Sequence, residues 1–173
     1  PPLQEGNLVP NWVQTTAFDP SGILLATGGI GGTVQLWNWR TGQPILSTPI
    51  AANTTQTCRV VFSPHGDKLV TVGRDGSNWT IRFWTLSGDE LSTLEHSQQF
   101  LNQVVFNSDG NLLTISDNSS AGSVMIWDVS HFPARQLREL RGLDLVQSLA
   151  FKGNGTQLVM AGITASGCWW TQQ

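Results

Sequence analysis

The chain has 173 residues, of which 39% are hydrophobic and only 12% charged, with 18 glycines and a formal net charge of −3. This length fits one domain with a sizeable core, and many glycines with few charges favour a turn-rich β protein. No cluster of Lys and Arg is present, which argues against a nucleic-acid partner. No apolar run approaches the about 18 residues of a membrane span, so we expect no membrane partner.

A unit of constant length repeats along the chain, which is the signature of a repeat architecture. A Phe-x-x-x-Gly turn begins at Phe18, Phe62, Phe106 and Phe151, at spacings of 44, 44 and 45 residues. A tryptophan follows each turn at a second constant position, at Trp37, Trp84, Trp127 and Trp170. We therefore predict one partial domain over 1–173, with repeats at approximately 7–50, 51–95, 96–140 and 141–173.

Each repeat contains four short strands separated by turns. In the second repeat these strands cover about 56–62, 68–72, 79–84 and 91–94, with Gly, Asp, Ser and Asn between them. In "TIRFW" one face carries Ile81 and Phe83 and the other carries Trp84, so both faces of the sheet need cover. Small antiparallel sheets that repeat and stack face to face predict an all-β fold, a β-propeller with four-stranded blades.

The motifs "VVFSPHGDKLVTVGRDG", "TIRFWTLSGDEL" and "GSVMIWDVS" resemble the WD-repeat family over almost the whole chain. The Trp-Asp pair itself occurs once, at Trp127 and Asp128, and no complete Gly-His pair is present. Four repeats are fewer than the seven that the resemblance implies. We therefore expect part of a larger propeller, whose ring is completed by missing chain or another subunit.

The resemblance also implies structural side chains, because this family joins a His, a Ser or Thr, an Asp and the Trp by hydrogen bonds within a blade. The third repeat offers four such residues and the second repeat offers three, with Asn53 as the nearest polar substitute for the missing His. Trp37 and Trp170 hold the Trp position of the first and last repeats. The expected structural residues are His96, Thr114, Asp117 and Trp127, together with Thr71, Asp75, Trp84, Trp37 and Trp170.

In WD-repeat proteins, partners bind most often where the innermost strands begin. The resemblance maps this face onto Trp12 and Gln14, Gln56 and Cys58, Phe100 and Asn102, and Leu145 and Gln147, with Arg74 and Ser116 before the turn aspartates. Large aromatics and arginine are the residues that interface hot spots favour. The alternative interpretation is that Phe100 and Leu145 only fill the centre of the ring.

The sequence predicts no catalytic residue, no metal site and no cofactor. The glycine-rich "GGIGGT" joins two strands, whereas a phosphate-binding loop leads into a helix. The three histidines have no partner at metal-binding spacing, and the neighbouring carboxylates of Asp89 and Glu90 point apart in a turn. Cys58 and Cys168 lack any metal-site pattern and fit a reducing compartment.

These patterns predict a non-catalytic scaffold for protein–protein interaction within a larger cytoplasmic protein or complex, of bacterial style. Two rival classes remain open. One is a propeller that binds a glycan or small molecule through exposed tryptophans, and the other is an enzyme with its site in the centre of the ring. A glycan binder is expected to repeat its exposed Trp in every blade, but the positions that correspond to Trp12 in the other repeats are Gln56, Phe100 and Leu145. A protein or peptide partner is therefore favoured.

Overall fold

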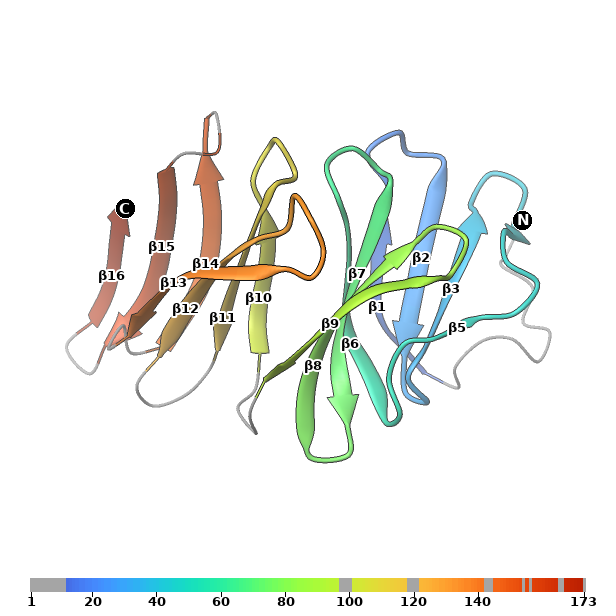
Figure 1. The fold of residues 1–173 in the computed structure, drawn as a ribbon, viewed down its shortest axis with the longest axis horizontal. Helices are drawn as coiled ribbons and strands as arrows, with labels where there is room; N and C mark the ends of the chain where they lie inside the picture. Colours follow the sequence, from blue (N-terminus) through green and yellow to red (C-terminus); the bar gives the residue numbers. More distant parts are fainter. Residues whose placement is uncertain are drawn as a thin grey trace. The chain divides into compact units, whose positions relative to one another are not determined.

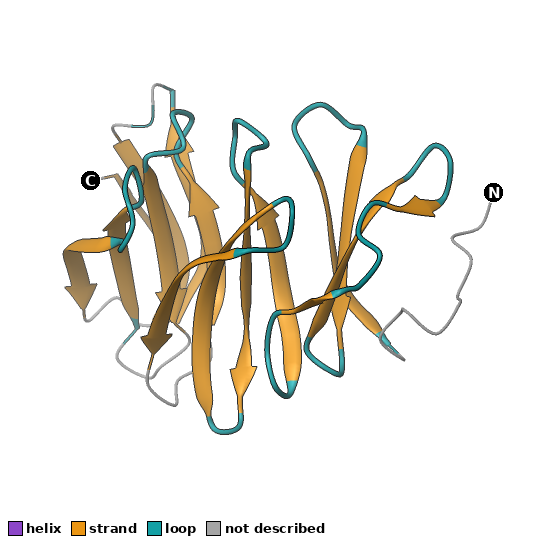
Figure 2. Ribbon diagram, turned by 45° about the vertical axis from the view of Figure 1, so that its right-hand side comes forward, coloured by secondary structure: helices purple, strands orange, loops and turns teal. Residues whose placement is uncertain are grey.

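The computed structural model describes residues 12–96, 101–117, 122–141, 145–153, 155, 157–164 and 167–172, with the backbone alone for His96, 163, 164 and 167–172. Within these ranges it contains strands and turns but no helix (Figure 2). No helix suited to crossing a membrane occurs in the described part of the chain. The chain divides into two compact units, residues 1–98 and 99–173, which are described separately.

Unit 1 contains two antiparallel sheets, which we call blades 1 and 2 (Figure 1). Blade 1 consists of β1 (Val13–Phe18), β2 (Leu24–Gly29), β3 (Thr33–Asn38), β4 (Gln43–Pro44) and β5 (Ile50–Ala51). The short strands β4 and β5 both pair with β3 and share the outer position of this sheet. Blade 2 has four full strands in sequential order, β6 (Gln56–Phe62), β7 (Lys68–Asp75), β8 (Asn78–Thr85) and β9 (Glu90–His96).

The turn after the first strand of a blade is stabilised by the residue that follows the repeat phenylalanine. The carboxylate of Asp19 accepts hydrogen bonds from the backbone N–H groups of Ile23 at 2.8 Å and Leu24 at 2.6 Å. The hydroxyl of Ser63 and the amide oxygen of Asn107 accept equivalent bonds in blades 2 and 3. Short polar side chains at this position therefore set the tight turn in each of these three blades.

The core of unit 1 lies between its two sheets, because β6 contacts both β1 and β2. Trp84 of blade 2 is only 5% exposed and belongs to a cluster that includes Leu36 of blade 1 and Phe62 and Leu69 of blade 2. Leu24 and Leu46 of blade 1 pack against the same cluster from its edge. Each fully buried aliphatic side chain stabilises the fold by about 1.5–3 kcal/mol, so this interface between blades holds unit 1 together.

Unit 2 contains blades 3 and 4 (Figure 1). Blade 3 has the strand order β10 (Leu101–Phe106), β11 (Leu112–Asp117), β12 (Ser123–Asp128) and β13 (Arg135–Arg141). Blade 4 has three described strands, β14 (Leu145–Lys152), β15 (Gln157–Thr164) and β16 (Gly167–Gln172). Its core joins Val124 of blade 3 to Val146, Leu149, Leu158 and Met160 of blade 4. The predicted all-β fold of four-stranded antiparallel blades is confirmed.

Candidate functional site

The repeat tryptophans of unit 1 are anchored by threonines. The indole Nε1 of Trp84 donates a hydrogen bond to Thr71 Oγ1 at 3.0 Å, and Trp37 Nε1 donates to Thr27 Oγ1 at 2.9 Å. All four side chains are buried. Thr71 was predicted from the sequence but Thr27 was not, although Thr27 precedes Thr71 by one repeat length. These pairs stabilise the two blades and leave no polar group free for chemistry.

Blade 3 does not repeat this arrangement. Trp127 is paired across the sheet with Leu113, whereas Thr114 is paired with Ile126, so Thr114 and Trp127 lie on opposite faces. Ile115 takes the place that Thr71 has in blade 2. Thr114 Oγ1 and Trp127 Nε1 are both buried, with no hydrogen-bond partner among the described residues. The predicted four-residue arrangement of the third repeat is therefore not assembled around Trp127.

The remaining members of that predicted arrangement have other roles or cannot be placed. Asp117 is buried and accepts two bonds from Ser123, from the backbone N–H at 2.9 Å and from the hydroxyl at 2.7 Å. It therefore orders the β11–β12 hairpin. The side chain of His96 lies outside the described residues.

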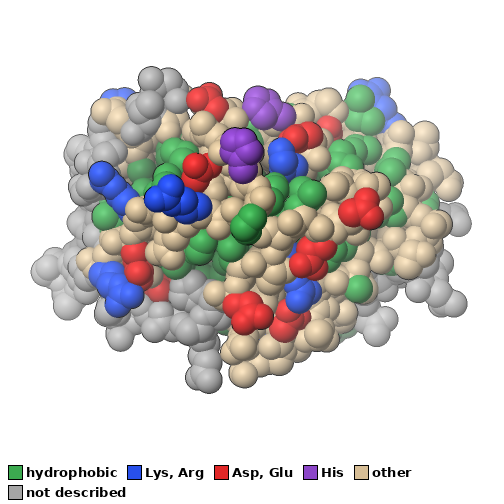
Figure 3. Space-filling view, in the orientation of Figure 1, with side chains coloured by type: hydrophobic (Ala, Val, Ile, Leu, Met, Phe, Trp, Pro, Cys, Tyr) green, Lys and Arg blue, Asp and Glu red, His purple; other side chains and the backbone are tan. Residues whose placement is uncertain are grey.

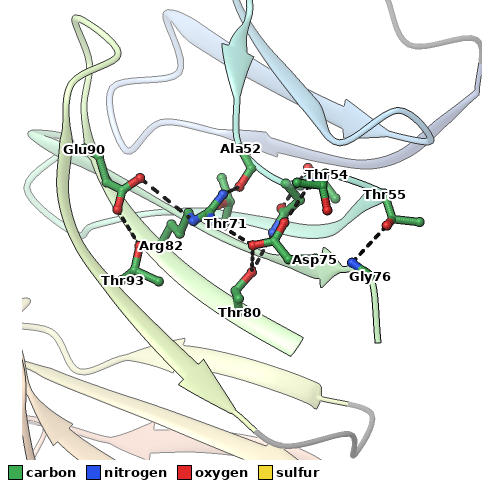
Figure 4. A network of polar contacts seen from close by, with 12 residues as sticks. Ala52, Thr54, Thr55, Thr71, Asp75, Gly76, Thr80, Arg82, Glu90 and Thr93 are labelled. Carbon is green, nitrogen blue, oxygen red and sulfur yellow. Dashed lines mark hydrogen bonds and ion pairs between the residues drawn. The ribbon is translucent and has the colours of Figure 1, made fainter. Parts of the chain in front are cut away.

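In blade 2, Asp75 is the centre of a polar network (Figure 4). One carboxylate oxygen accepts from the backbone N–H of Thr54 at 2.6 Å, and the other accepts from Arg82 Nη2 at 2.7 Å and Thr80 Oγ1 at 3.3 Å. The second guanidinium nitrogen of Arg82 donates to the carbonyl oxygen of Ala52 at 2.5 Å. Asp75 thus ties its hairpin to the segment that leads from blade 1 into blade 2.

Asn53 completes this network. Its side-chain Nδ2 donates to Thr80 Oγ1 at 2.7 Å, and its Oδ1 accepts from Thr57 Oγ1 at 3.1 Å. Asn53 therefore bonds to the hairpin side of blade 2 rather than to the Thr71–Trp84 pair. We interpret the network as structural, because all of its hydrogen bonds join residues of unit 1 to one another, and Arg82 Nε faces Glu90 at 3.9 Å.

The innermost strands of unit 1 begin at one end of its two sheets, where four backbone segments lie side by side. The N–H of Ile30 donates to the carbonyl oxygen of Trp12 at 3.1 Å, and Ile30 forms an isolated bridge with Gln56. Gln56 in turn is paired with Arg74 across blade 2. Trp12, Ile30, Gln56 and Arg74 thus form a continuous row, which we call the strand-start row.

The strand-start row is apolar at one end and cationic at the other. Trp12 is 73% exposed and Ile30 is 44% exposed. The guanidinium carbon of Arg74 lies 6.0 Å from the ring centre of Trp79, close enough for a cation–π contact. Ile30 was missed by the sequence analysis, although it precedes Arg74 by 44 residues, one repeat length. The row offers exposed hydrophobic area beside a positive charge.

Two further predicted residues flank the row. Gln14 is exposed on β1, and Gln56 Nε2 donates to the sulfur of Cys58 at 3.0 Å. Burial raises the pKa of the Cys58 thiol, against the lowering effects of Gln56, Arg59 and Arg74. Cys58 is therefore a protonated, half-buried thiol and not an activated nucleophile.

In unit 2 the residues predicted for the partner face differ in their exposure. Asn102 Nδ2 donates to the carbonyl oxygen of Val146 at 2.9 Å, which places β10 beside the beginning of β14. Leu145 is half-buried and Gln147 is exposed, whereas Ser116 is fully buried and cannot contact a partner. Phe100 lies outside the described residues.

The pairing of β15 with β16 changes the interpretation of Trp170. Trp170 pairs with Ala161, and Gln172 pairs with Val159. In blade 2, however, Trp84 pairs with Leu69, whose counterpart in blade 4 is Leu158. Trp170 is therefore at the strand position of Ile81, three residues before the repeat position.

The described titratable residues do not converge on a reaction centre. No group of three His, Cys, Asp or Glu side chains that could hold a metal ion occurs among them. Asp89 accepts hydrogen bonds from Ser87 and Thr85 within its own turn, whereas Glu90 contacts Thr93 on β9. These neighbouring carboxylates thus serve separate local contacts.

Sheets of four antiparallel strands that repeat with one sequence period define the blades of a β-propeller. The family model described as "WD domain, G-beta repeat" matches residues 4–38 and 88–128. The sequence match and the fold together support a WD-repeat propeller family for this chain.

Several curated proteins share the repeats. Protein FIZZY-RELATED 3 of Arabidopsis thaliana is 28% identical over 104 residues, which cover 60% of this chain and 21% of that protein. Eukaryotic translation initiation factor 3 subunit I of Aspergillus terreus is 30% identical over 115 residues, 66% of this chain and 30% of that protein. This chain therefore spans less than a third of either relative. Both are eukaryotic, so they give no support to the expected bacterial source.

A solved structure shares the fold. The computationally designed Ika8 protein matches with a TM-score of 0.69 and 22% identity, over 91% of this chain and 45% of that chain. At this identity the likeness concerns the fold alone.

Proposed function

We propose that this chain is a non-catalytic WD-repeat scaffold whose strand-start row binds a protein or peptide partner. The observation that carries the proposal is the exposure of Trp12 and Ile30, which are joined by a backbone hydrogen bond in a row that ends at Arg74. An exposed indole with a neighbouring aliphatic side chain and an arginine has the composition of an interface hot spot. The match to the WD-repeat family supports the same class of function.

The rival function, binding of a glycan by an array of tryptophans, has less support. The tryptophans with large exposure among the described residues are Trp12 and Trp39. Trp12 precedes β1, whereas Trp39 follows β3 and packs edge-on against Phe18 at the end of β1, with ring centres 6.0 Å apart. The two indoles thus belong to opposite ends of blade 1 and cannot stack on one sugar.

The test is recovery of partners from a lysate of the source organism with the chain immobilised. We expect Trp12→Ala and Arg74→Glu to lose a partner that the unchanged chain retains. Trp39→Ala is the matched control, because it removes another exposed indole from the same blade. Recovery of every partner by both face variants would overturn the proposal, and binding of a glycan that Trp12→Ala abolishes would establish the rival.

We further propose that the propeller works in the cytoplasm within a larger protein or complex, with additional chain or another subunit completing its ring. The supporting observation is that the aligned part of this chain covers only 21% and 30% of the lengths of the two relatives described above. The mass of the 173-residue chain in solution tests the assembly. A stable monomer of 18.8 kDa would contradict it.

A further inference from the structure

A pocket of about 450 Å³ lies within unit 2, between blade 3 and blade 4. Its volume falls in the range of about 300–1,000 Å³ that is usual for ligand sites. Its walls are apolar apart from one arginine: they consist of Leu112, Ile126, Leu137, Arg138, Phe151, Gly155 and Leu158.

The corresponding space in unit 1 is filled by a tryptophan. Phe62 and Leu69, paired across blade 2, correspond to Phe151 and Leu158, paired across blade 4. In unit 1 this pair packs with Trp84, which is 5% exposed.

The opposite wall of the pocket, formed by blade 3, corresponds to blade 1 in unit 1. Leu36, paired with Ala26 in blade 1, has the place of Ile126, paired with Thr114 in blade 3. Leu24 and Leu112, the first residues of β2 and β11, also correspond. Both walls of the pocket are therefore those of an indole-binding space, left open among the described residues of unit 2.

A β-bulge shapes the mouth of the pocket. Along β13 the pairing shifts between Trp127 with Gln136 and Ile126 with Arg138, so Leu137 is the extra residue. A bulge redirects side chains that would otherwise alternate, and both Leu137 and Arg138 line the pocket. Figure 3 shows hydrophobic side chains beside Lys and Arg over this part of blade 3.

The charge at the mouth is available to a ligand. Arg138 is exposed, and no ion pair or hydrogen bond joins its side chain to any described residue. The neighbouring Glu139 is already paired with Arg141 at 2.9 Å. An apolar pocket with an unpaired guanidinium at its edge is complementary to an aromatic group that has a carboxylate beside it.

We propose that this pocket binds a large aromatic side chain of a partner protein, flanked by an acidic residue that pairs with Arg138. We favour a polypeptide as the ligand, because the matching space in unit 1 is filled by a protein side chain, that of Trp84 near the end of β8. Within unit 2 the pocket is separate from the predicted partner-face residue Leu145, which lies six residues from Phe151 on β14, about 20 Å. Its failure would leave the proposed function untouched.

The test is titration of the 173-residue chain with three capped tripeptides, Glu-Trp-Glu, Lys-Trp-Lys and Glu-Ala-Glu, followed by methyl NMR. We expect Glu-Trp-Glu to shift the Ile126, Leu137 and Leu158 methyl signals with a millimolar or lower Kd. Lys-Trp-Lys is expected to bind about fivefold more weakly, because it cannot pair with Arg138. Glu-Ala-Glu, which lacks the indole, is expected to leave the signals unchanged.

Two variants with matched controls test the location. Leu137→Asp places a charge at the mouth and should abolish binding, whereas Leu91→Asp, at the equivalent bulge of blade 2, should not. Arg138→Glu should reverse the preference between the acidic and basic peptides, whereas Ser92→Glu at the matching position should not. The proposal is overturned if Leu137→Asp leaves the affinity unchanged, or if the basic peptide binds the unchanged chain as tightly as the acidic one.

Discussion

Arg82 and Asp75 form an ion pair of 2.7 Å, with each side chain only 20% exposed. Arg82 projects from the middle of β8, so its charge would be costly without a partner. Asp75, at the end of β7, supplies that partner and also accepts the backbone N–H of Thr54. The pair therefore connects blade 2 to the segment that precedes it.

Replacing Asp75 by asparagine is expected to lower the free energy of unfolding by about 2 kcal/mol. The amide keeps an acceptor for Thr54 but leaves the Arg82 guanidinium, which is 20% exposed, with only the longer 3.9 Å ion pair to Glu90. Urea denaturation followed by tryptophan fluorescence measures the loss. Asp89→Asn, in an exposed turn of the same blade, should change stability by less than about 0.5 kcal/mol. Equal effects of the two substitutions would contradict the role of the ion pair.

A second prediction concerns two buried threonines with different surroundings. Thr71→Val removes the acceptor of Trp84 Nε1 and leaves a buried donor unsatisfied, so it should cost about 1–3 kcal/mol. Thr114→Val removes a hydroxyl that has no partner among the described residues and should be neutral or stabilising. Thermal unfolding of both variants decides the matter. A comparable loss for Thr114→Val would show that this hydroxyl has a partner after all.

The fold could be predicted from the sequence because the period of Phe and Trp is visible without any knowledge of pairing. The side-chain arrangement of blade 3 could not be predicted, because it depends on the pairing register of the β11–β12 hairpin, which decides which side chains share a face of the sheet. Thr71 precedes Trp84 by 13 residues, and Thr114 precedes Trp127 by the same spacing. Strand pairing nevertheless puts the first two on one face and the second two on opposite faces. A shift of one residue exchanges the faces of a strand.

The candidate site, too, could be predicted only in part from the sequence. The resemblance to WD-repeat proteins predicts Trp12, Gln56 and Arg74 for the partner face, and the structure places them in one row. Ile30 precedes Arg74 by one repeat length, so its position in the row could have been found from the sequence. Its exposure could not, because nothing in the sequence shows whether a hydrophobic residue in a glycine-rich turn is exposed. Trp170 has the same spacing from Trp127 as Trp127 has from Trp84, but β16 pairs it with Ala161, whereas Trp84 pairs with Leu69, so spacing alone does not identify the repeat position.

A third prediction concerns pH. Burial acts to raise the pKa of Asp19, but hydrogen bonds from Ser21, Leu24 and Ile23 outweigh it and hold the pKa below its ordinary value of 3.8. A carboxyl group whose pKa is lower in the folded state stabilises the protein above the unfolded pKa. That contribution is lost as the pH falls through the folded value.

Asp19→Asn should therefore be less stable than the unchanged chain at neutral pH, by about 1 kcal/mol. The difference should shrink as the pH falls from about 5 to about 2. Urea midpoints measured across this range test the expectation. Asp109→Asn, in the corresponding turn of blade 3, controls for the removal of one negative charge. A difference that stays constant down to the lowest pH would rule out the Asp19 carboxylate as its source.

The last prediction concerns the backbone under the strand-start row. A Cβ atom at Gly73 would lie 2.2 Å from the carbonyl oxygen of Gln56 and 2.2 Å from Asn53 Oδ1. Because one of these atoms belongs to the backbone, Gly73→Ala must displace β6 or β7, at a cost of about 3 kcal/mol. A Cβ at Gly28 would meet only side-chain methyl groups at 3.0–3.2 Å, so Gly28→Ala should cost about 1 kcal/mol.

The same substitutions should differ in their effect on partner binding. Since Gln56 and Arg74 flank the displaced contact, Gly73→Ala should also weaken partner binding in the protein that remains folded, and Gly28→Ala should not. Chemical denaturation together with the partner-recovery assay tests both parts, and unchanged stability of Gly73→Ala would contradict the close approach of these strands.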